Sequence, residues 1–271
     1  MTCTCLDQFG KNPMFPMTIG EPWMWASFIA FIVCMLALDL FVFGGRKAHR
    51  VSPREALSWV IAWSGLTLAF AALLWWYLND TFGAQVAQRK TLEFLTGYLI
   101  EQSLSIDNMF VFVMIFGYFA VPPELQRRVL LYGVLGAIVM RTLMIFAGVW
   151  LVTQFAWLLY VFGAFLLITG IKMLVFADQQ PDLARNPILR WLRSHLRVTD
   201  GFHGERFFVV LNGVRWATPM FLVMVLIEAS DLVFAVDSIP AIFAVTTDPF
   251  IVFTSNIFAI MGLRALYFLL A

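Results

Sequence analysis

Apolar residues run along this chain in seven long blocks separated by short polar connections. Each block approaches or exceeds about 20 residues, the length at which a helix crosses the hydrocarbon core of a bilayer. Tryptophan and tyrosine at several block ends suit the membrane interface. The pattern therefore predicts an all-α membrane protein, a single polytopic domain over residues 1–271. The predicted transmembrane helices are residues 23–43, 57–79, 91–119, 128–152, 155–176, 217–245 and 250–270.

Composition supports a bilayer as the solvent of this chain. Hydrophobic residues make up 61% of it and charged residues 13%, and its mean hydropathy is +0.84. Soluble domains are about 45–50% apolar and about 25% charged. The first 20 residues lack a basic segment followed by an apolar one, so we expect no cleavable signal peptide. The three cysteines, Cys3, Cys5 and Cys34, have no spaced histidines that would indicate a zinc site.

Lysine and arginine are concentrated in alternate connections between the predicted helices. Thirteen of the 18 lie in residues 44–54, 121–128 and 172–215, and these connections fall on the same side of the membrane. Cytoplasmic loops carry such an excess of positive charge. We therefore expect the N-terminus outside and these basic loops in the cytoplasm.

The longest cytoplasmic connection, residues 177–216, contains two local signals. The sequence NPILRWLRSHLR at 186–197 predicts a short amphipathic basic helix that could lie on anionic lipid. Asn212-Gly213 stands between two β-prone runs, which predicts a tight hairpin. We interpret the segment as a solvated connector, with regulation or docking of protein partners as the alternative.

Six acidic and two basic residues stand out in the apolar runs of the predicted helices. A charged side chain at the centre of a transmembrane helix costs at least about 2.5–3.5 kcal/mol, so such residues must protonate, pair or bind a cation. A neutral, hydrogen-bonded carboxyl is the alternative for any single acid, but the surplus indicates a path for a cation or for protons. The acids are Asp39, Glu101, Asp107, Glu228, Asp231 and Asp237, and the bases are Arg141 and Arg264.

The two most polar stretches inside predicted helices resemble each other. EQSLSIDN at 101–108 aligns without gaps to DLVFAVDS at 231–238. The first lies in a helix predicted to run inward and the second in one predicted to run outward. This is typical of an inverted-topology repeat, whose substrate site lies near the bilayer midplane. We expect a first repeat at 91–176 and a second at 217–271.

Helical geometry and donor type narrow the chemistry of these stretches. At about 100° per residue, Glu101 and Asn108 share a helix face, whereas Asp107 lies about 120° away. Pro240 has no N–H, and we expect it to kink or unwind the turn beside Asp237 and to expose backbone oxygens. The donors are carboxylate, amide and hydroxyl oxygens, and no predicted helix contains histidine. Such donors suit Mg²⁺, Ca²⁺ and Mn²⁺.

Other function classes lack support in the sequence. It contains no phosphate-binding glycine loop, no nucleophile motif and no nucleic-acid-binding element. We therefore expect neither an enzyme nor an ATP-driven pump, and no tightly bound cofactor. Transport by this chain would use an ion gradient or downhill flow.

Three segments are similar to a known family. They are LEFLTGYLIEQSLSIDNMFVF, VTDGFHGERFF and IEASDLVFAVDSIPAIFAVTTDPFIVFTSNIFAIMGLRALYFLL. They resemble the TerC/Alx family of bacterial integral membrane proteins, which is associated by name with tellurium resistance and by function with manganese export or manganese delivery to secreted enzymes. The resemblance covers essentially the whole chain and implies a bacterial inner-membrane carrier related to the lysine-exporter superfamily of inverted repeats. Family members usually continue for further spans, so we expect the second repeat here to lack its last helix.

The residues and the resemblance together predict a secondary transporter that exports Mn²⁺, with Ca²⁺ and Mg²⁺ as weaker candidates. An acidic cluster would repel an oxyanion, so any effect on tellurite resistance would be indirect. One alternative is a membrane scaffold that hands metal or redox state to partner proteins through residues 177–216, and another is a carrier of an organic cation. The predicted metal ligands are Asp39, Glu101, Asp107, Asn108, Glu228, Asp231, Asp237 and Ser238, and Arg141 and Arg264 are predicted to pair with the carboxylates when the ion leaves.

Overall fold

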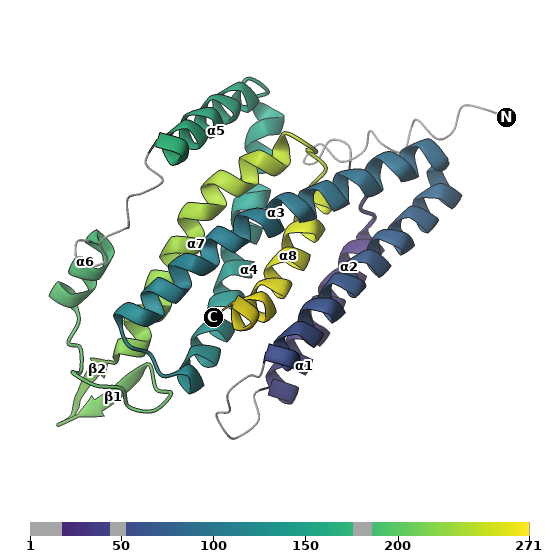
Figure 1. Cartoon of the computed structure of the whole chain (residues 1–271). Helices are drawn as coiled ribbons and strands as arrows, with labels where there is room; N and C mark the ends of the chain where they lie inside the picture. Colours follow the sequence, from purple (N-terminus) through teal and green to yellow (C-terminus); the bar gives the residue numbers. More distant parts are fainter. Residues whose placement is uncertain (1–17, 44–52, 176–185, 271) are drawn as a thin grey trace.

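The computed structural model describes residues 18–43, 53–175 and 186–270, and helices dominate it (Figure 1). A helix occupies each of the seven segments predicted to be helical, with ends shifted by up to seven residues. The fold class of an all-α membrane protein is confirmed. The elements are α1 (Pro22–Phe43), α2 (Pro53–Phe82), α3 (Ala84–Tyr118), α4 (Pro123–Gln154), α5 (Leu158–Val175), α6 (Pro187–His195), β1 (Phe208–Leu211), β2 (Val214–Ala217), α7 (Pro219–Phe243) and α8 (Pro249–Leu270).

Five of these helices, α2, α3, α4, α7 and α8, are long and apolar enough to cross a membrane. Shorter apolar stretches occupy Pro22–Leu38 of α1 and Leu158–Lys172 of α5. The number of crossings and the side on which each end lies remain predictions.

Local sequence explains where most helices begin. Six of the eight described helices start at a proline, namely Pro22, Pro53, Pro123, Pro187, Pro219 and Pro249. Proline suits the first helical position because its fixed φ is helical and no hydrogen bond is lost there. Between α2 and α3 the chain reverses through Gly83 alone, whose φ of +87° favours glycine.

The predicted hairpin and amphipathic helix are both present. Asn212 and Gly213 have φ of 51° and 77°, as a type I′ turn requires, and they join β1 to β2 in antiparallel register. Helix α6 is capped by Asn186, whose side chain accepts hydrogen bonds from two backbone N–H groups. Its Leu189 and Leu192 are buried in a cluster with the start of α7. This face of α6 therefore contacts protein, and the contact of the basic face with anionic lipid stays a prediction.

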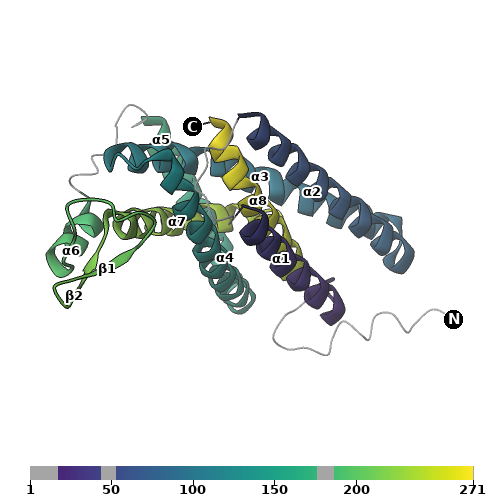
Figure 2. The same ribbon diagram turned by 90° about the horizontal axis from the view of Figure 1, so that it is seen from below.

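Helices α3, α4, α7 and α8 form the core of the molecule (Figures 1 and 2). The most extensive helix contacts of α8 are with α3, and those of α7 are with α4. Helix α2 packs against α3 and α8, and α5 lies along α7. Almost every residue of α8 from Phe250 to Leu263 is buried, so α8 is the central helix of the described chain.

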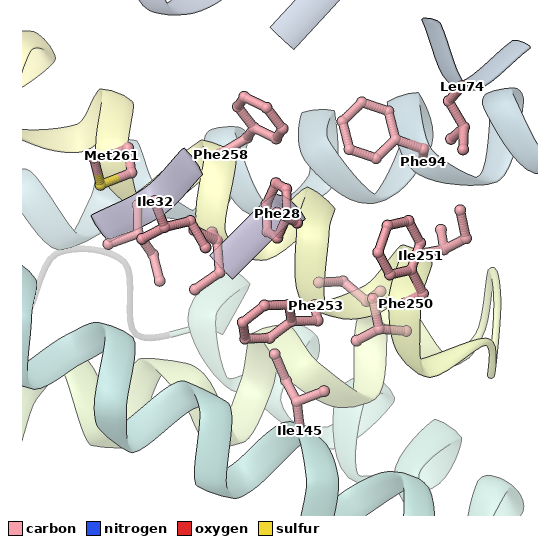
Figure 3. Close-up of a cluster of buried hydrophobic side chains, with 14 of the residues drawn as sticks. Phe28, Ile32, Leu74, Phe94, Ile145, Phe250, Ile251, Phe253, Phe258 and Met261 are labelled. Carbon is pink, nitrogen blue, oxygen red and sulfur yellow. The ribbon is translucent and has the colours of Figure 1, made fainter. Parts of the chain in front are cut away.

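Aromatic side chains hold α1 and α3 against α8 (Figure 3). The ring of Phe258 lies 5.6 Å from that of Phe28 and 5.9 Å from that of Phe94, between ring centroids. Such separations are typical of favourable aromatic pairs. A Cβ at Gly97 of α3 would lie 2.9 Å from Oγ of Ser255, so glycine permits the close approach of α3 to α8.

Both helices that carry the polar stretches are continuous. Helix α3 runs without a break from Ala84 to Tyr118, and α7 continues through Pro240 to Phe243. Pro240 lies in the last turn of α7; it removes one hydrogen bond, to the carbonyl of Val236, and the chain stays helical to Phe243. The unwound turn expected beside Asp237 is therefore absent, which corrects the prediction made from the sequence.

Candidate functional site

Arg141 lies at the centre of the four-helix core, between two carboxylates from different helices. Its guanidinium pairs with Glu101 of α3 through Nη1. It also donates to Asp231 of α7, through Nη2 at 2.7 Å and through Nε at 3.2 Å. Glu101 and Arg141 have no exposed surface, and Asp231 is 6% exposed. Buried charges at this depth require partners, because an isolated one would cost several kcal/mol.

Asn256 brings α8 into the same arrangement. Its Nδ2 donates to the second oxygen of Glu101 at 3.0 Å, and the residue is fully buried. We refer to Glu101, Arg141, Asp231 and Asn256 as the central network. It contains two carboxylates and one guanidinium, so with all three groups ionised it carries one surplus negative charge.

Several buried oxygens near these positions lack a hydrogen-bond partner among the described residues. They are Oε1 of Gln102, Oγ of Ser105, Oδ1 of Asn108, Oγ of Ser238 and Oδ1 of Asn256. Leaving a buried polar atom unpaired costs about 1–3 kcal/mol, and native proteins leave few such atoms. Oxygens in this state are available to a ligand with a positive charge.

The unpaired oxygens extend in both directions from the central network. Asn108 follows Glu101 by seven residues on α3, and Ser238 follows Asp231 by seven residues on α7, so each pair shares a helix face. Seven residues correspond to about 10 Å along a helix. Because α3 and α7 run in opposite directions (Figure 1), Asn108 lies toward one end of the core and Ser238 toward the other.

The remaining predicted site residues are not part of the central network. Asp107 is exposed on the surface of the bundle, and Asp237 is half-buried. Glu228 is half-buried, and its carboxyl packs where a Cβ at Gly136 would lie only 2.1 Å away. The side chains of Asp39 and Arg264 lie outside the described part of the structure.

The acids that the structure describes do not form a preassembled metal centre. Within residues 18–43, 53–175 and 186–270, no group of three or more Asp, Glu, His or Cys side chains is placed to hold an ion. In this arrangement Arg141 occupies the position between Glu101 and Asp231 that a cation would take. A cation would reach these carboxylates by displacing the guanidinium, and the unpaired oxygens of Asn108 and Ser238, about 10 Å away along their helices, lie too far from the carboxylates to bind the same ion.

A small cavity borders Asp231. Its volume is about 20 Å³, enough for one water molecule. Phe112, Leu130, Gly133 and Ile227 contribute to a lining that is otherwise apolar. The cavity lies toward the end of the core where α4 and α7 begin, the end predicted to face the cytoplasm.

A second group of buried polar residues lies at the opposite end of the core. Asp248, which precedes α8, accepts hydrogen bonds from the backbone N–H groups of Ile19 and Phe250 and from the Thr18 hydroxyl, all at 3.0–3.1 Å. Lys90 Nζ lies 3.5 Å from its carboxylate. Burial raises the pKa of the Asp248 carboxyl, and the Lys90 charge and these hydrogen bonds offset part of the rise.

Glu93 of α3 completes this second group. Its carboxylate pairs with Arg89 at 3.0 Å and with Lys90 at 2.8 Å, and it accepts a hydrogen bond from the Thr246 hydroxyl at 2.7 Å. We refer to Lys90, Glu93, Thr246 and Asp248 as the end network. It ties the starts of α1, α3 and α8 to the end of α7.

Sequence reasoning missed both Asn256 and the end network. Asn256 ends the polar triplet Thr254–Asn256 in an otherwise apolar helix, a signal of the same kind as the acids. Glu93 is an acid inside the predicted span 91–119, and it could have been counted with the other six. Asp248 could not have been found this way, because it precedes its helix and its side-chain partners Lys90 and Thr18 are 158 and 230 positions away.

Comparison with known proteins supports the resemblance. The chain is 59% identical over 254 residues to a Salmonella typhi protein named "Putative membrane-bound redox modulator Alx", covering 94% of this chain and 79% of that protein. The Escherichia coli K12 protein of the same name is 58% identical over 254 residues, which also cover 94% of this chain and 79% of that protein. An uncharacterised membrane protein of Myxococcus xanthus is 52% identical over 257 residues, which cover 95% of this chain and 77% of that protein.

No solved structure matches this chain. Residues 86–271 match the family described as "Integral membrane protein TerC family", and this range contains both the central network and the end network. The chain therefore belongs to the TerC family of integral membrane proteins.

Proposed function

We propose that this chain is a secondary carrier that exports a hard divalent cation, most readily Mn²⁺, across the bacterial inner membrane. The observation that carries the proposal is the central network, two carboxylates that share one guanidinium inside a membrane-embedded core. A surplus negative charge at this depth favours a cation as its partner.

The donors around the central network support a hard ion. The carboxylates of Glu101 and Asp231 stand with the amide of Asn256, and the unpaired Ser105 hydroxyl lies one turn from Glu101 on α3. The unpaired oxygens of Asn108 and Ser238 lie further along the same helix faces, and none of these groups is a sulfur or imidazole ligand. Mg²⁺, Ca²⁺ and Mn²⁺ prefer such oxygens. Mn²⁺ is favoured among them by the resemblance to manganese exporters.

Arg141 would act as an internal substitute for the cargo. With the guanidinium between Glu101 and Asp231, both carboxylates remain compensated when no ion is bound. An arriving divalent cation competes with Arg141 for them, and its departure lets the arginine return. Because either Arg141 or the cation is always paired with Glu101 and Asp231, the two carboxylates would at no stage lie in the membrane without a positive partner.

The helix contacts support an inverted repeat as the framework for this exchange. A two-fold relation between residues 91–176 and 217–271 would exchange α3 with α7 and α4 with α8. The same relation would place the contact between α3 and α8 onto the contact between α7 and α4. These two contacts are the most extensive ones that α8 and α7 make, as a repeat would require. The relation also matches Glu101–Asn108 to Asp231–Ser238, each an acid followed after seven residues by an unpaired oxygen.

A second candidate is a membrane scaffold without transport. The name of the Salmonella and Escherichia coli relatives favours it, as does the absence of a preassembled three-ligand group among the described side chains. In that case the central network would bind metal or transmit redox state to partner proteins through residues 186–217, and no ion would cross.

Mn²⁺ flux into proteoliposomes that contain a metal-sensitive dye tests the proposal. We compare the parent chain with Glu101→Gln, Asp107→Ala and, as a control for charge loss at an exposed position, Asp80→Asn. A carrier is expected to lose flux with Glu101→Gln and to keep it with Asp80→Asn. Flux lost with Asp107→Ala would add this exposed acid to the path. A parent chain that binds Mn²⁺ in equilibrium dialysis but carries no flux would contradict transport and support the scaffold.

A further inference from the structure

Helix α6 and the β1–β2 hairpin form a surface that the proposed transport does not use. We define the α6 platform as residues 186–217, which lie together at one edge of the molecule, beside the start of α7 (Figures 1 and 2). The two parts are joined directly, because the segment after α6 pairs with the end of β2 at Val198 and Ala217. The platform therefore presents a single continuous surface next to the membrane-spanning core.

The position of α6 relative to the membrane follows from its packing. Leu189 and Leu192 are buried in a cluster with Met220, Leu222 and Leu226 from the first turns of α7. Helix α7 has 25 residues and is about 37 Å long, so its first turns lie at the level where hydrocarbon gives way to headgroups. Contact with those turns holds α6 at the same level.

The free face of the platform has the composition of a membrane interface. Trp191 is 59% exposed and stacks on His195 at 4.7 Å between ring centroids, and Val210 of the hairpin is 65% exposed. Phe208 is also exposed, with the Arg215 guanidinium 5.8 Å from its ring. Exposed apolar side chains of this kind mark a surface that another phase or molecule covers. Tryptophan is enriched where bilayer and water meet.

The charge of the platform is complementary to anionic lipid. It contains five arginines and two acids, and one of those acids, Glu205, is paired with Arg128 of α4. All five arginines are exposed; they are Arg190, Arg193, Arg197, Arg206 and Arg215. Long basic side chains at this depth extend their charged ends into the headgroup layer. Each is worth about a fivefold gain in association with an anionic surface.

We propose that the α6 platform docks onto the anionic phospholipid headgroups of the bilayer in which this chain is embedded. Trp191 and the exposed apolar residues of the hairpin enter the interface, and the arginines bind the phosphates. Because α6 is packed on α7, which carries Asp231, lipid composition would set the position of a helix that contributes to the central network. The docking itself does not depend on which cargo the protein carries.

A spin label on α6 tests the docking directly. Ser194 is exposed on α6, and Ser194→Cys provides the attachment point in a background where Cys3, Cys5 and Cys34 are replaced by serine. The labelled chain is placed in nanodiscs of phosphatidylcholine alone or of phosphatidylcholine with phosphatidylglycerol. Collision rates with a water-soluble nickel complex and with oxygen then report the depth of the label.

Anionic lipid is expected to lower the nickel collision rate and to raise the oxygen collision rate. The double variant Arg190→Gln with Arg193→Gln should lower the docking equilibrium constant on anionic lipid about 25-fold, and the difference between the two kinds of nanodisc should disappear. The matched control is Arg54→Gln with Lys172→Gln, which removes two exposed charges outside the platform and should leave the dependence intact. Ionic strength near 1 M, where the Debye length is about 3 Å, should weaken the docking.

The proposal is overturned if the label collides equally with nickel in both kinds of nanodisc. It is also overturned if protection requires an added acidic peptide, polyglutamate, and not anionic lipid, because the platform would then be a protein-docking surface. Neither result bears on Mn²⁺ flux, so a failure here is distinguishable from a failure of the proposed carrier.

Discussion

In the described part of the chain, buried acidic side chains lie in two places, and the two differ in how many cations face the carboxylates. In the end network, Asp248 and Glu93 face two cations, Arg89 and Lys90, and their oxygens accept bonds from hydroxyl and backbone groups. In the central network, two carboxylates share one guanidinium, and unpaired oxygens lie on the same helix faces.

This difference separates a structural role from a functional one. The end network joins the ends of four helices, and both of its carboxylates pair with Lys90 and accept hydrogen bonds from other groups, so it serves to hold those ends together. In the central network two carboxylates share one guanidinium, and the Asn256 carbonyl oxygen is unpaired, so a bound cation would supply the missing positive charge. A protein that only needed stability would gain by replacing such a network with apolar residues.

The largest effect on stability is expected from Arg141→Gln. It leaves Glu101 and Asp231 buried without a counter-charge, which should lower the free energy of unfolding by about 3–5 kcal/mol. Unfolding titrations in mixed micelles measure this. Adding Glu101→Gln and Asp231→Asn to the same chain should restore most of the loss. Equal stability of Arg141→Gln and the parent would mean that the central charges do not depend on each other.

An intermediate effect is expected in the end network from Asp248→Ala. The change removes the hydrogen bonds to Ile19, Thr18 and Phe250, including the cap of α8, and should cost about 2–3 kcal/mol. Asp80→Ala, at an exposed position near the end of α2, should change stability by less than about 0.5 kcal/mol. If Asp248→Ala is as harmless as Asp80→Ala, the end network is not structural.

The smallest effects on stability should differ in sign between an unpaired hydroxyl near the central network and a paired hydroxyl in the end network. Ser238→Ala removes an unpaired buried hydroxyl, so the chain should be unchanged or more stable by up to about 1 kcal/mol. Thr246→Val removes a hydroxyl that donates to Glu93, and it should cost about 1–2 kcal/mol. Thermal unfolding of the two variants side by side measures the difference. Destabilisation by Ser238→Ala equal to that by Thr246→Val would show that the Ser238 hydroxyl is paired after all.

Much of the fold could be predicted because the controlling signals are local. Apolar length located all seven helices, and Asn212-Gly213 located the hairpin, since each depends on neighbouring residues alone. The importance of Glu101, Arg141 and Asp231 also followed from a local fact, a charge inside an apolar helix. The unwound turn predicted from Pro240 is absent, because this proline lies only three residues before the end of α7, and the sequence does not place that end accurately.

The partners within the site could not be predicted, because they depend on how each helix is rotated against its neighbours. The sequence places Asp107 and Glu101 on different faces of α3 but does not say which face meets α4. The structure turns Glu101 toward Arg141 and leaves Asp107 exposed. Asn256 joins them from 155 positions away, a contact that packing around Phe258 and Gly97 determines. Whether Asp107 and Asp237 bind the cargo stays a prediction.

The central claim is that the incompletely paired network carries the cation and the fully paired one does not. The most direct test is Mn²⁺ flux in proteoliposomes for Asp231→Asn and Asp248→Asn, each normalised to the amount of folded protein. Both substitutions remove one buried carboxylate and keep its shape. The account predicts that Asp231→Asn reduces flux to that of empty liposomes and that Asp248→Asn transports at the rate of the parent. Flux that survives in Asp231→Asn, or that is lost equally in both variants, would contradict it.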